Sequence, residues 1–402
     1  MRLRYKAVSQ DGKKVRGFVE AKEIKDAAYY LRQRNLIPIQ ISKEAEYEFV
    51  KKIPFVNKTK SKDLILFTRQ LSSMLASGLT LIKSLEILKE QTANKYLQET
   101  IGGVLLDLEE GKSFSDSIAK YPDVFPTIYV SLVKAGESSG LLDKIFLRLA
   151  TNLEKQHKLR NTVRGALMYP IIVISLMVIV MLILMVFVIP ELSKLYDSLG
   201  VTLPFVTRVV VGISSGVGKI WFLLVGLVAI FIYGFIRWKK TPTGRELYDK
   251  NILRFPLFGK IMRETILTEF SRTFGLLVGT GTLIVDALNQ SAAVTGNSMY
   301  DKAIREISKR VEKGVPVGEA MSTYTSYFPP LLIQLVKVGE ETGKMDENLL
   351  KASEYFEEEV SQAVKTLTTA MEPFIMIVLG IGVGFLVFSV ITPIYSILNA
   401  VQ

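Results

Sequence analysis

The chain has 402 residues, of which 49% are hydrophobic, and its 50 basic and 39 acidic side chains give a net charge of +11. The absence of cysteine excludes disulfides and thiolate metal sites, and the single histidine, His157, leaves nucleophilic triads and zinc centres without their usual parts. We expect His157 to be solvated on a charged helix. The basic excess follows the ends of apolar segments, so we expect no nucleic-acid partner.

The first 42 residues predict a small separate unit. Asp11-Gly12 lies between two short apolar runs, which is a strong β-hairpin signal. Residues 25–35 then predict an amphipathic helix, and residues 36–41 a returning strand. We therefore expect a ββαβ domain over 1–42 and a charged linker over 43–60.

Two segments of the chain repeat one another. Residues 67–190 align without a gap to residues 270–393, at a constant offset of 203. The shared positions include Phe67, Gly78, Gly111, Phe125 and Pro126, which recur as Phe270, Gly281, Gly314, Phe328 and Pro329. Helical periodicity punctuated by glycine and proline predicts a mainly α protein with two homologous six-helix bundles, at 61–167 and 238–370.

The sharpest repeated motif is Gly136-Glu137-x-x-Gly140-x-x-Asp143, which recurs as Gly339-Glu340-x-x-Gly343-x-x-Asp346. One interpretation is a turn in which Gly136 ends a helix, Gly140 starts the next, and Asp143 lies in its first turn. The turn does not require Glu137. The alternative is a partner- or cation-contact role for Glu137, Asp143, Glu340 and Asp346, although two acids per copy are too few for a calcium cage. We predict no dedicated metal site.

Three apolar stretches predict transmembrane helices, at 168–190, 219–237 and 371–397, separated by a loop at 191–218. Orientation follows the cations beside them. Those cations are Lys155, Lys158, Arg160, Arg164, Arg237, Lys239, Lys240, Arg245 and Lys365. We therefore expect a cytoplasmic N-terminus and two cytoplasmic bundles, with the short loop and the C-terminus outside.

The predicted spans contain few polar groups, which disfavours transport because proton and ion pathways need ionisable groups at membrane depth. Gly380 and Gly384 have the small-xxx-small spacing that favours helix packing, against another subunit, the first span or another membrane protein. Glu110-Gly111-Lys112-Ser113 lacks the earlier glycine of a phosphate-binding loop, so it is interpreted as a helix end. We expect no catalytic residue and no cofactor.

With these features the chain resembles the inner-membrane platform proteins of type II secretion (the F component) and of type IV pilus assembly (the C component). The likeness covers the Tyr5-Lys-Ala-Val8 unit, the paired helical domains and both Gly-Glu-x-x-Gly-x-x-Asp turns. It also includes the Met-x-Pro pairs Met168 and Pro170, and Met371 and Pro373, which begin spans one and three.

The resemblance implies a bacterial inner-membrane hub. Its cytoplasmic domains would engage a hexameric assembly ATPase, and its membrane part would handle pilin or pseudopilin subunits beside other inner-membrane assembly proteins, as a homo-oligomer. The alternative from the residues is a subunit of a transporter or channel. Sequence does not separate a pilus from a secretion machine, and it does not show which bundle meets the ATPase.

Overall fold

The computed structural model describes residues 2–9, 14–21, 24–33, 36–43, 59–188, 190, 191, 194, 212, 226–227, 229–256 and 258–401. They fall into two compact units, Met1–Ala150 and Thr151–Gln402. Most of the predicted linker, nearly all of the predicted 191–218 loop and part of the predicted second span lie outside the described residues.

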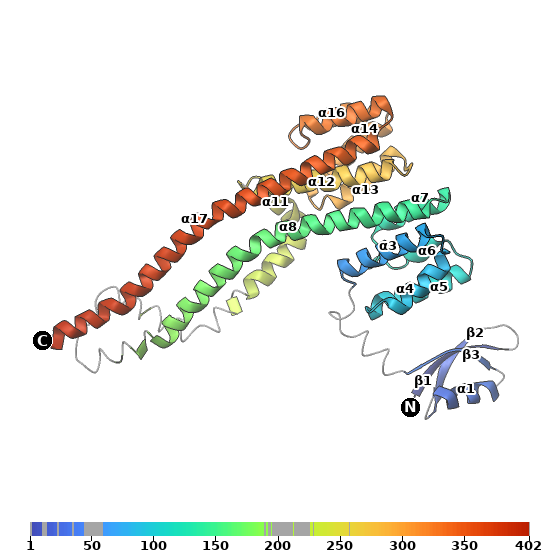
Figure 1. Cartoon of the computed structure of the whole chain (residues 1–402), viewed down its shortest axis with the longest axis horizontal. Helices are drawn as coiled ribbons and strands as arrows, with labels where there is room; N and C mark the ends of the chain where they lie inside the picture. The colour runs from blue at the N-terminus through green and yellow to red at the C-terminus, as the bar shows by residue number, and fades with distance from the viewer. Residues whose placement is uncertain are drawn as a thin grey trace. The chain divides into compact units, whose positions relative to one another are not determined.

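The N-terminal elements follow the predicted ββαβ order. Strands β1 (Arg2–Ser9) and β2 (Lys14–Glu20) precede helix α1 (Ile24–Gln33) and strand β3 (Leu36–Lys43). The sheet order is β2-β1-β3 with both pairings antiparallel (Figure 1), and the β1–β3 register shifts between Lys6 and Ala7. Ala7 of the sheet and two residues of α1, Ala27 and Leu31, are buried and form the small core.

The first repeat folds into six helices, as predicted. They are α3 (Ser61–Ala76), α4 (Leu81–Gln91), α5 (Lys95–Glu109), α6 (Phe114–Ala119), α7 (Thr127–Ser139) and α8 (Leu142–Ile183). A short π-helical segment, Leu184–Val188, continues α8. The end of α3 requires glycine, because Gly78 has φ +87°.

Aromatic rings fill the core of the first bundle. Phe67 of α3 contacts Phe125, and Tyr129 of α7 contacts both Phe125 and Phe146. All four rings are buried. Burial raises the pKa of Tyr129, whose hydroxyl lies 3.1 Å from the Thr68 hydroxyl. The phenol therefore stays neutral, with its one polar group paired, as a buried hydroxyl requires.

The second repeat has a counterpart of every helix. They are α12 (Phe258–Val278), α13 (Ile284–Val294), α14 (Ser298–Glu312), α15 (Val317–Ser322), α16 (Pro330–Thr342) and α17 (Met345–Val401). Phe270 contacts Phe328, as Phe67 contacts Phe125 in the first copy. One additional helix, α11 (Pro242–Ile252), precedes this bundle and was not predicted separately.

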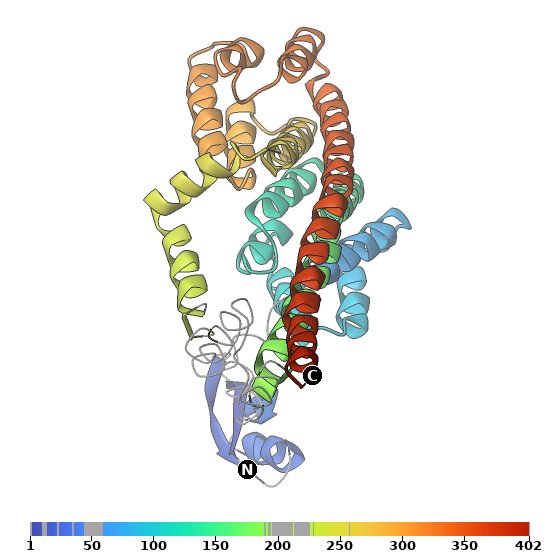
Figure 2. The same cartoon turned by 90° about the vertical axis from the view of Figure 1, so that its left-hand side faces the viewer.

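The long helix α8 crosses from the first unit into the second. Within the second unit, its Leu159 packs with Ile261 of α12 and with Val360 and Val364 of α17, so α8 and α17 run side by side (Figures 1 and 2). The predicted boundary at 167 therefore differs from the division at Ala150. Hydropathy marks where α8 becomes continuously apolar, but it does not show where α8 stops packing on the first bundle and begins to pack on α12 and α17. On this stretch His157 is half-buried rather than solvated, with Nε2 enclosed and unpaired among the described residues.

Among the described residues, two helices are long and apolar enough to cross a membrane: Leu142–Val188 and Met345–Gly384. Both continue directly from a bundle, and both contain a proline at the same repeat position, Pro170 and Pro373. Residues 229–240, which overlap the predicted second span at 229–237, are helical, and they run from the second bundle separately from α17 (Figure 2). The count of three spans stays a prediction.

Candidate functional site: the duplicated helix junction

The repeated Gly-Glu-x-x-Gly-x-x-Asp motif forms a junction of three helices in each copy. Helix α7 continues to Ser139, and Gly140 closes it in the left-handed conformation with φ +70°; Gly343 does the same after α16 with φ +69°. The prediction that Gly136 ends the helix is therefore wrong. The two glycines of the motif have different tasks, and only the second supplies a positive φ.

The first glycine permits close packing. A Cβ at Gly136 would lie 2.8 Å from Ile145 Cγ1, and a Cβ at Gly339 would lie 2.7 Å from the Met345 Cα. Real side chains do not approach so closely, so a methyl group at either position would require the contacting atoms to shift. Each first glycine thus sets the separation between a bundle helix and the long helix that follows it.

The glutamate reaches the other way, to the short helix before it. Glu137 of α7 accepts hydrogen bonds from the Phe114 amide at 2.6 Å and the Ser115 amide at 3.0 Å, at the start of α6. The Ser115 hydroxyl donates a third bond at 2.7 Å. The first amides of a helix have no partner within the helix, and a carboxylate there also meets the positive end of the dipole. Glu137 therefore ties α7 to α6.

The second copy reproduces this contact with the same distances. Glu340 of α16 accepts from the Val317 amide at 2.6 Å and the Gly318 amide at 3.0 Å, at the start of α15. The hydroxyl of Ser115 has no counterpart here, since Gly318 occupies its position and lies against Lys337. Ser113, which accepts from the Asp116 amide, is replaced by Pro316, which makes no side-chain cap. The start of α15 therefore depends more heavily on its glutamate.

The other predicted site residues lie on the far side of the turn. Asp143 and Asp346 stand in the first turns of α8 and α17, where a carboxylate favours the helix dipole, as the first interpretation predicts. Nothing among the described residues forms a group of three or more His, Cys, Asp or Glu side chains with metal-site geometry. A direct partner- or cation-contact role for Glu137, Asp143, Glu340 and Asp346 stays a prediction.

A buried charge cluster, missed from the sequence, joins three helices of the second unit. Arg272 of α12 is 2% exposed, and its guanidinium lies 2.5 Å from Glu357 of α17 and 3.7 Å from Glu269. Gln156 of α8 donates to Glu269 at 2.8 Å. Lys155 of α8 adds an ion pair with Glu354 of α17 at 2.9 Å. The signal was present, since the repeat offset places Arg69 and Glu154 where Arg272 and Glu357 stand.

Glu264 of α12 is a second acidic group missed from the sequence, and its charged neighbours are Glu359, Lys260 and Arg263. One of its carboxylate oxygens is buried without a hydrogen-bond partner in the described part of the chain. Burial and the neighbouring Glu359 both raise the pKa of Glu264, whereas Lys260 and Arg263 oppose the shift. Lys260 is itself paired with Glu359 at 3.0 Å. Because Lys260 pairs with Glu359, the carboxyl group of Glu264 is less well compensated by positive charge.

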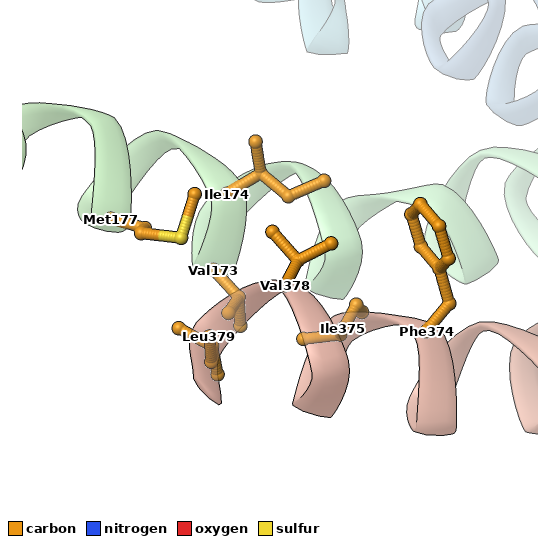
Figure 3. Close-up of a pocket in the computed structure, with 7 residues that line it drawn as sticks. All are labelled: Val173, Ile174, Met177, Phe374, Ile375, Val378 and Leu379. Atoms are coloured by element: carbon orange, nitrogen blue, oxygen red, sulfur yellow. The ribbon is translucent and has the colours of Figure 1, made fainter. Parts of the chain in front are cut away.

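Further along, α8 and α17 contact each other through apolar side chains that lie within the predicted first and third spans. Val173, Ile174 and Met177 of α8 face Phe374, Ile375, Val378 and Leu379 of α17 across a shallow pocket (Figure 3). The glycine that contacts α8 is Gly382, whose added Cβ would lie 3.3 Å from the Met177 sulfur. Gly380 and Gly384 have nothing within 4 Å, so helix packing through these two stays a prediction for a contact outside this chain.

The arrangement is mechanical in character. Each copy clamps a short helix, a bundle helix and a long helix at one junction, and each long helix continues into a membrane-length apolar segment. The clamps use backbone amides and close packing, which fix the angles between the helices.

Comparison with known proteins finds the same duplication. The family described as type II secretion system protein F matches residues 67–190 and 270–393, and its N-terminal domain matches residues 4–42. The type IV pilus assembly protein PilC of Thermus thermophilus is 36% identical over 99% of this chain and 98% of its own length. The protein of the same name from Pseudomonas aeruginosa is 35% identical over 92% and 98%, and that organism's type II secretion system protein F is 28% identical over 98% and 98%.

Proposed function

The chain belongs to the type II secretion system protein F family, and on that premise we propose that it is the inner-membrane platform on which a pilus or pseudopilus is built. The family supplies structural components of secretion and pilus machinery and is not an enzyme family. The higher identity to proteins named for pilus assembly supports a pilus machine over a secretion machine.

In this proposal both bundles face the cytoplasm. The cations that flank the apolar segments support that orientation, because lysine and arginine accumulate on the cytoplasmic side of spans. An intervening second span returns the chain to the same side before the second bundle begins. The external loop and C-terminus would then lie in the periplasm.

The observation that carries the proposal is the continuity of α8 and α17. Each begins at a Gly-Glu junction in a bundle and ends as an apolar helix, without a loop between. A loop would absorb motion, whereas an unbroken helix transmits it. A push on a bundle would therefore reach the membrane, where pilin subunits with apolar helices of their own are held.

The partners in this proposal are a hexameric assembly ATPase on the cytoplasmic side, pilin or pseudopilin subunits in the membrane, and further copies of the chain. Glu137 and Glu340 contribute by orienting the helices around each junction. Exposed apolar side chains on the bundles, such as Leu66, Leu106 and Leu283, offer contact points for the ATPase.

The test uses the absence of native cysteine. Leu106→Cys and Leu283→Cys place one exposed thiol on each bundle, because their side chains are 57% and 73% exposed. A membrane-impermeant maleimide should label both in inverted membrane vesicles and neither in spheroplasts. A benzophenone maleimide at the same positions should cross-link the chain to the assembly ATPase. Labelling of the two thiols from opposite sides, or normal pilus assembly in a strain lacking the chain, would overturn the proposal.

A further inference from the structure

Helix α11 and its surroundings concentrate positive charge at the end of an apolar helix. Between Arg237 and Arg263 the chain has eight basic and two acidic side chains, although the net charge of all 402 residues is only +11. Over half of the net charge therefore lies in less than a tenth of the chain. No counterpart of this helix occurs in the described part of the first copy.

Both acids of this segment are already engaged. Glu246 pairs with Lys302 of α14 at 2.8 Å, and this lysine lowers the pKa of Glu246. Asp249 is buried and accepts from the Ser298 amide at 2.8 Å. Four of the cations are exposed and have no ion pair among the described residues. They are Arg237, Lys240, Lys250 and Arg254.

Large apolar side chains are exposed among these cations. Phe255, between α11 and α12, is 64% exposed, and Phe258, the first residue of α12, is 42% exposed. Trp238, at the end of the apolar helix, is 41% exposed. Trp and Phe beside Lys and Arg are typical of a segment that lies in the headgroup layer, with apolar groups below and cations at phosphate level. We call Arg237, Trp238, Lys240, Lys250, Arg254, Phe255 and Phe258 the α11 surface.

The α11 surface is attached firmly at both of its ends. Toward the second bundle, the Asn297 side chain donates to the Asp249 carbonyl at 3.3 Å, in addition to the Glu246 and Asp249 contacts. Toward the apolar helix, Tyr248 packs on Phe235 and receives Lys239 over its ring at 3.7 Å. A Cβ at Gly244 would lie 2.1 Å from the Trp238 carbonyl oxygen, so α11 turns tightly against the end of that helix.

We propose that the α11 surface rests on the cytoplasmic leaflet, binds anionic phospholipid headgroups and holds the second bundle at a fixed height above the membrane. Its position favours lipid over a protein partner, because it begins at the last turn of a helix whose described residues 229–236 carry no Asp, Glu, Lys or Arg. The inference rests on the proposed cytoplasmic placement of this bundle. Each Lys or Arg held near an anionic surface strengthens binding about fivefold.

The experiment places one environment-sensitive label on the full chain in nanodiscs. Phe255→Cys is labelled with NBD, and a matched control carries the label at Leu283→Cys. Both positions are exposed and apolar, and they lie at opposite ends of α12, whose 21 residues span about 30 Å. In nanodiscs containing phosphatidylglycerol, lipids with a spin label near the headgroup should quench NBD at 255 and leave NBD at 283 unquenched.

Replacing phosphatidylglycerol by phosphatidylcholine should weaken the quenching at 255. Lys250→Gln with Arg254→Gln should do the same, lowering the ratio of docked to undocked segment about fivefold for each cation removed. Far-UV circular dichroism should show that the variants keep their helices. Equal quenching at 255 and 283, or quenching that is the same in both lipids, would overturn the proposal. So would NBD at 255 that is unquenched by lipid but shielded when the assembly ATPase is added, which would indicate a protein-docking surface.

The nanodisc has no inside or outside, so this result does not depend on topology. The maleimide experiment on spheroplasts tests the cytoplasmic placement separately. Quenching at 255 together with labelling of Leu283→Cys from outside would retain the lipid contact and reject the proposed orientation.

Discussion

The two helical copies share a fold and a junction but differ in what stabilises each of them. In the first copy, serine side chains support the start of α6 beside Glu137. In the second copy, glycine and proline occupy those positions, and Glu340 alone provides the side-chain acceptor. The second copy also has the buried Arg272 cluster and helix α11, which contacts α14 through Glu246 and Asp249. The junction is thus the common requirement, whereas the supports around it have diverged.

The largest expected difference between the two copies is the loss of stability when the buried Arg272 or its counterpart Arg69 is removed. Arg272→Ala would leave Glu357 and Glu269 without their cation, and breaking a buried pair costs about 3–5 kcal/mol. We expect a value near the lower end, because the Glu357 side chain is 23% exposed. Arg69→Ala should cost less, since Arg69 is only half-buried. Thermal unfolding of the full chain in detergent, with hydrogen exchange resolving α3 and α12, measures both.

A double variant sharpens this prediction. Arg272→Met with Glu357→Leu removes both charges and should recover part of the loss, because a buried apolar pair has no desolvation penalty. If Arg69→Ala destabilises the chain as much as Arg272→Ala, the two copies do not differ in the way that burial indicates.

The close-packing glycines provide the second comparison. Gly339→Ala would place a methyl group 2.7 Å from the Met345 backbone, which cannot move without shifting α17. Gly136→Ala meets the Ile145 side chain, which can change rotamer. Overpacking costs about 1–3 kcal/mol, and we expect Gly339→Ala at the upper end and Gly136→Ala at the lower. Equal shifts in unfolding temperature would contradict the distinction.

The capping glutamates should show a smaller asymmetry. Loss of a helix cap costs about 0.5–2 kcal/mol, and an enclosed amide left unpaired adds to it. Glu340→Ala should speed amide exchange in α15 more than Glu137→Ala does in α6, because Ser113 still caps α6. Glu340→Gln retains an acceptor oxygen and should restore much of the protection. Faster exchange in α6 than in α15 would refute the argument.

The smallest effect is a pH dependence confined to the first copy. Asp107 bonds Lys112 at 2.6 Å and Lys120 at 2.5 Å, and these two lysines lower the pKa of Asp107. A lowered pKa stabilises the fold above the ordinary value of 3.8, and this contribution is lost as pH falls through the folded-state pKa. Exchange near α6 should therefore accelerate below pH 4 relative to α15, where Arg310 occupies the position of Asp107. Asp107→Asn should remove the difference.

Much of this architecture could be predicted from local signals. The antiparallel pairing of β1 with β2, the helix end at Gly78 and the direct continuation of each bundle into an apolar helix all follow from residue chemistry and period. The role of Gly136 could not be predicted, because a glycine needed for close approach and a glycine needed for positive φ look identical in a sequence. Glu137 was singled out, but its partners are backbone amides more than twenty residues away. A contact to a backbone amide does not depend on the residue type of the donor, so the sequence pattern does not indicate it.

Pro170 of α8 and Pro373 of α17 stand at the same repeat position, about 30 residues beyond their junctions. A proline in a helix lacks the amide that would close one turn, and the helix bends most easily there. Both long helices therefore have a turn weakened by proline at the same repeat position, close to where the apolar segment begins. A force on either bundle would therefore bend its long helix at Pro170 or Pro373, and the apolar segment beyond the proline would tilt.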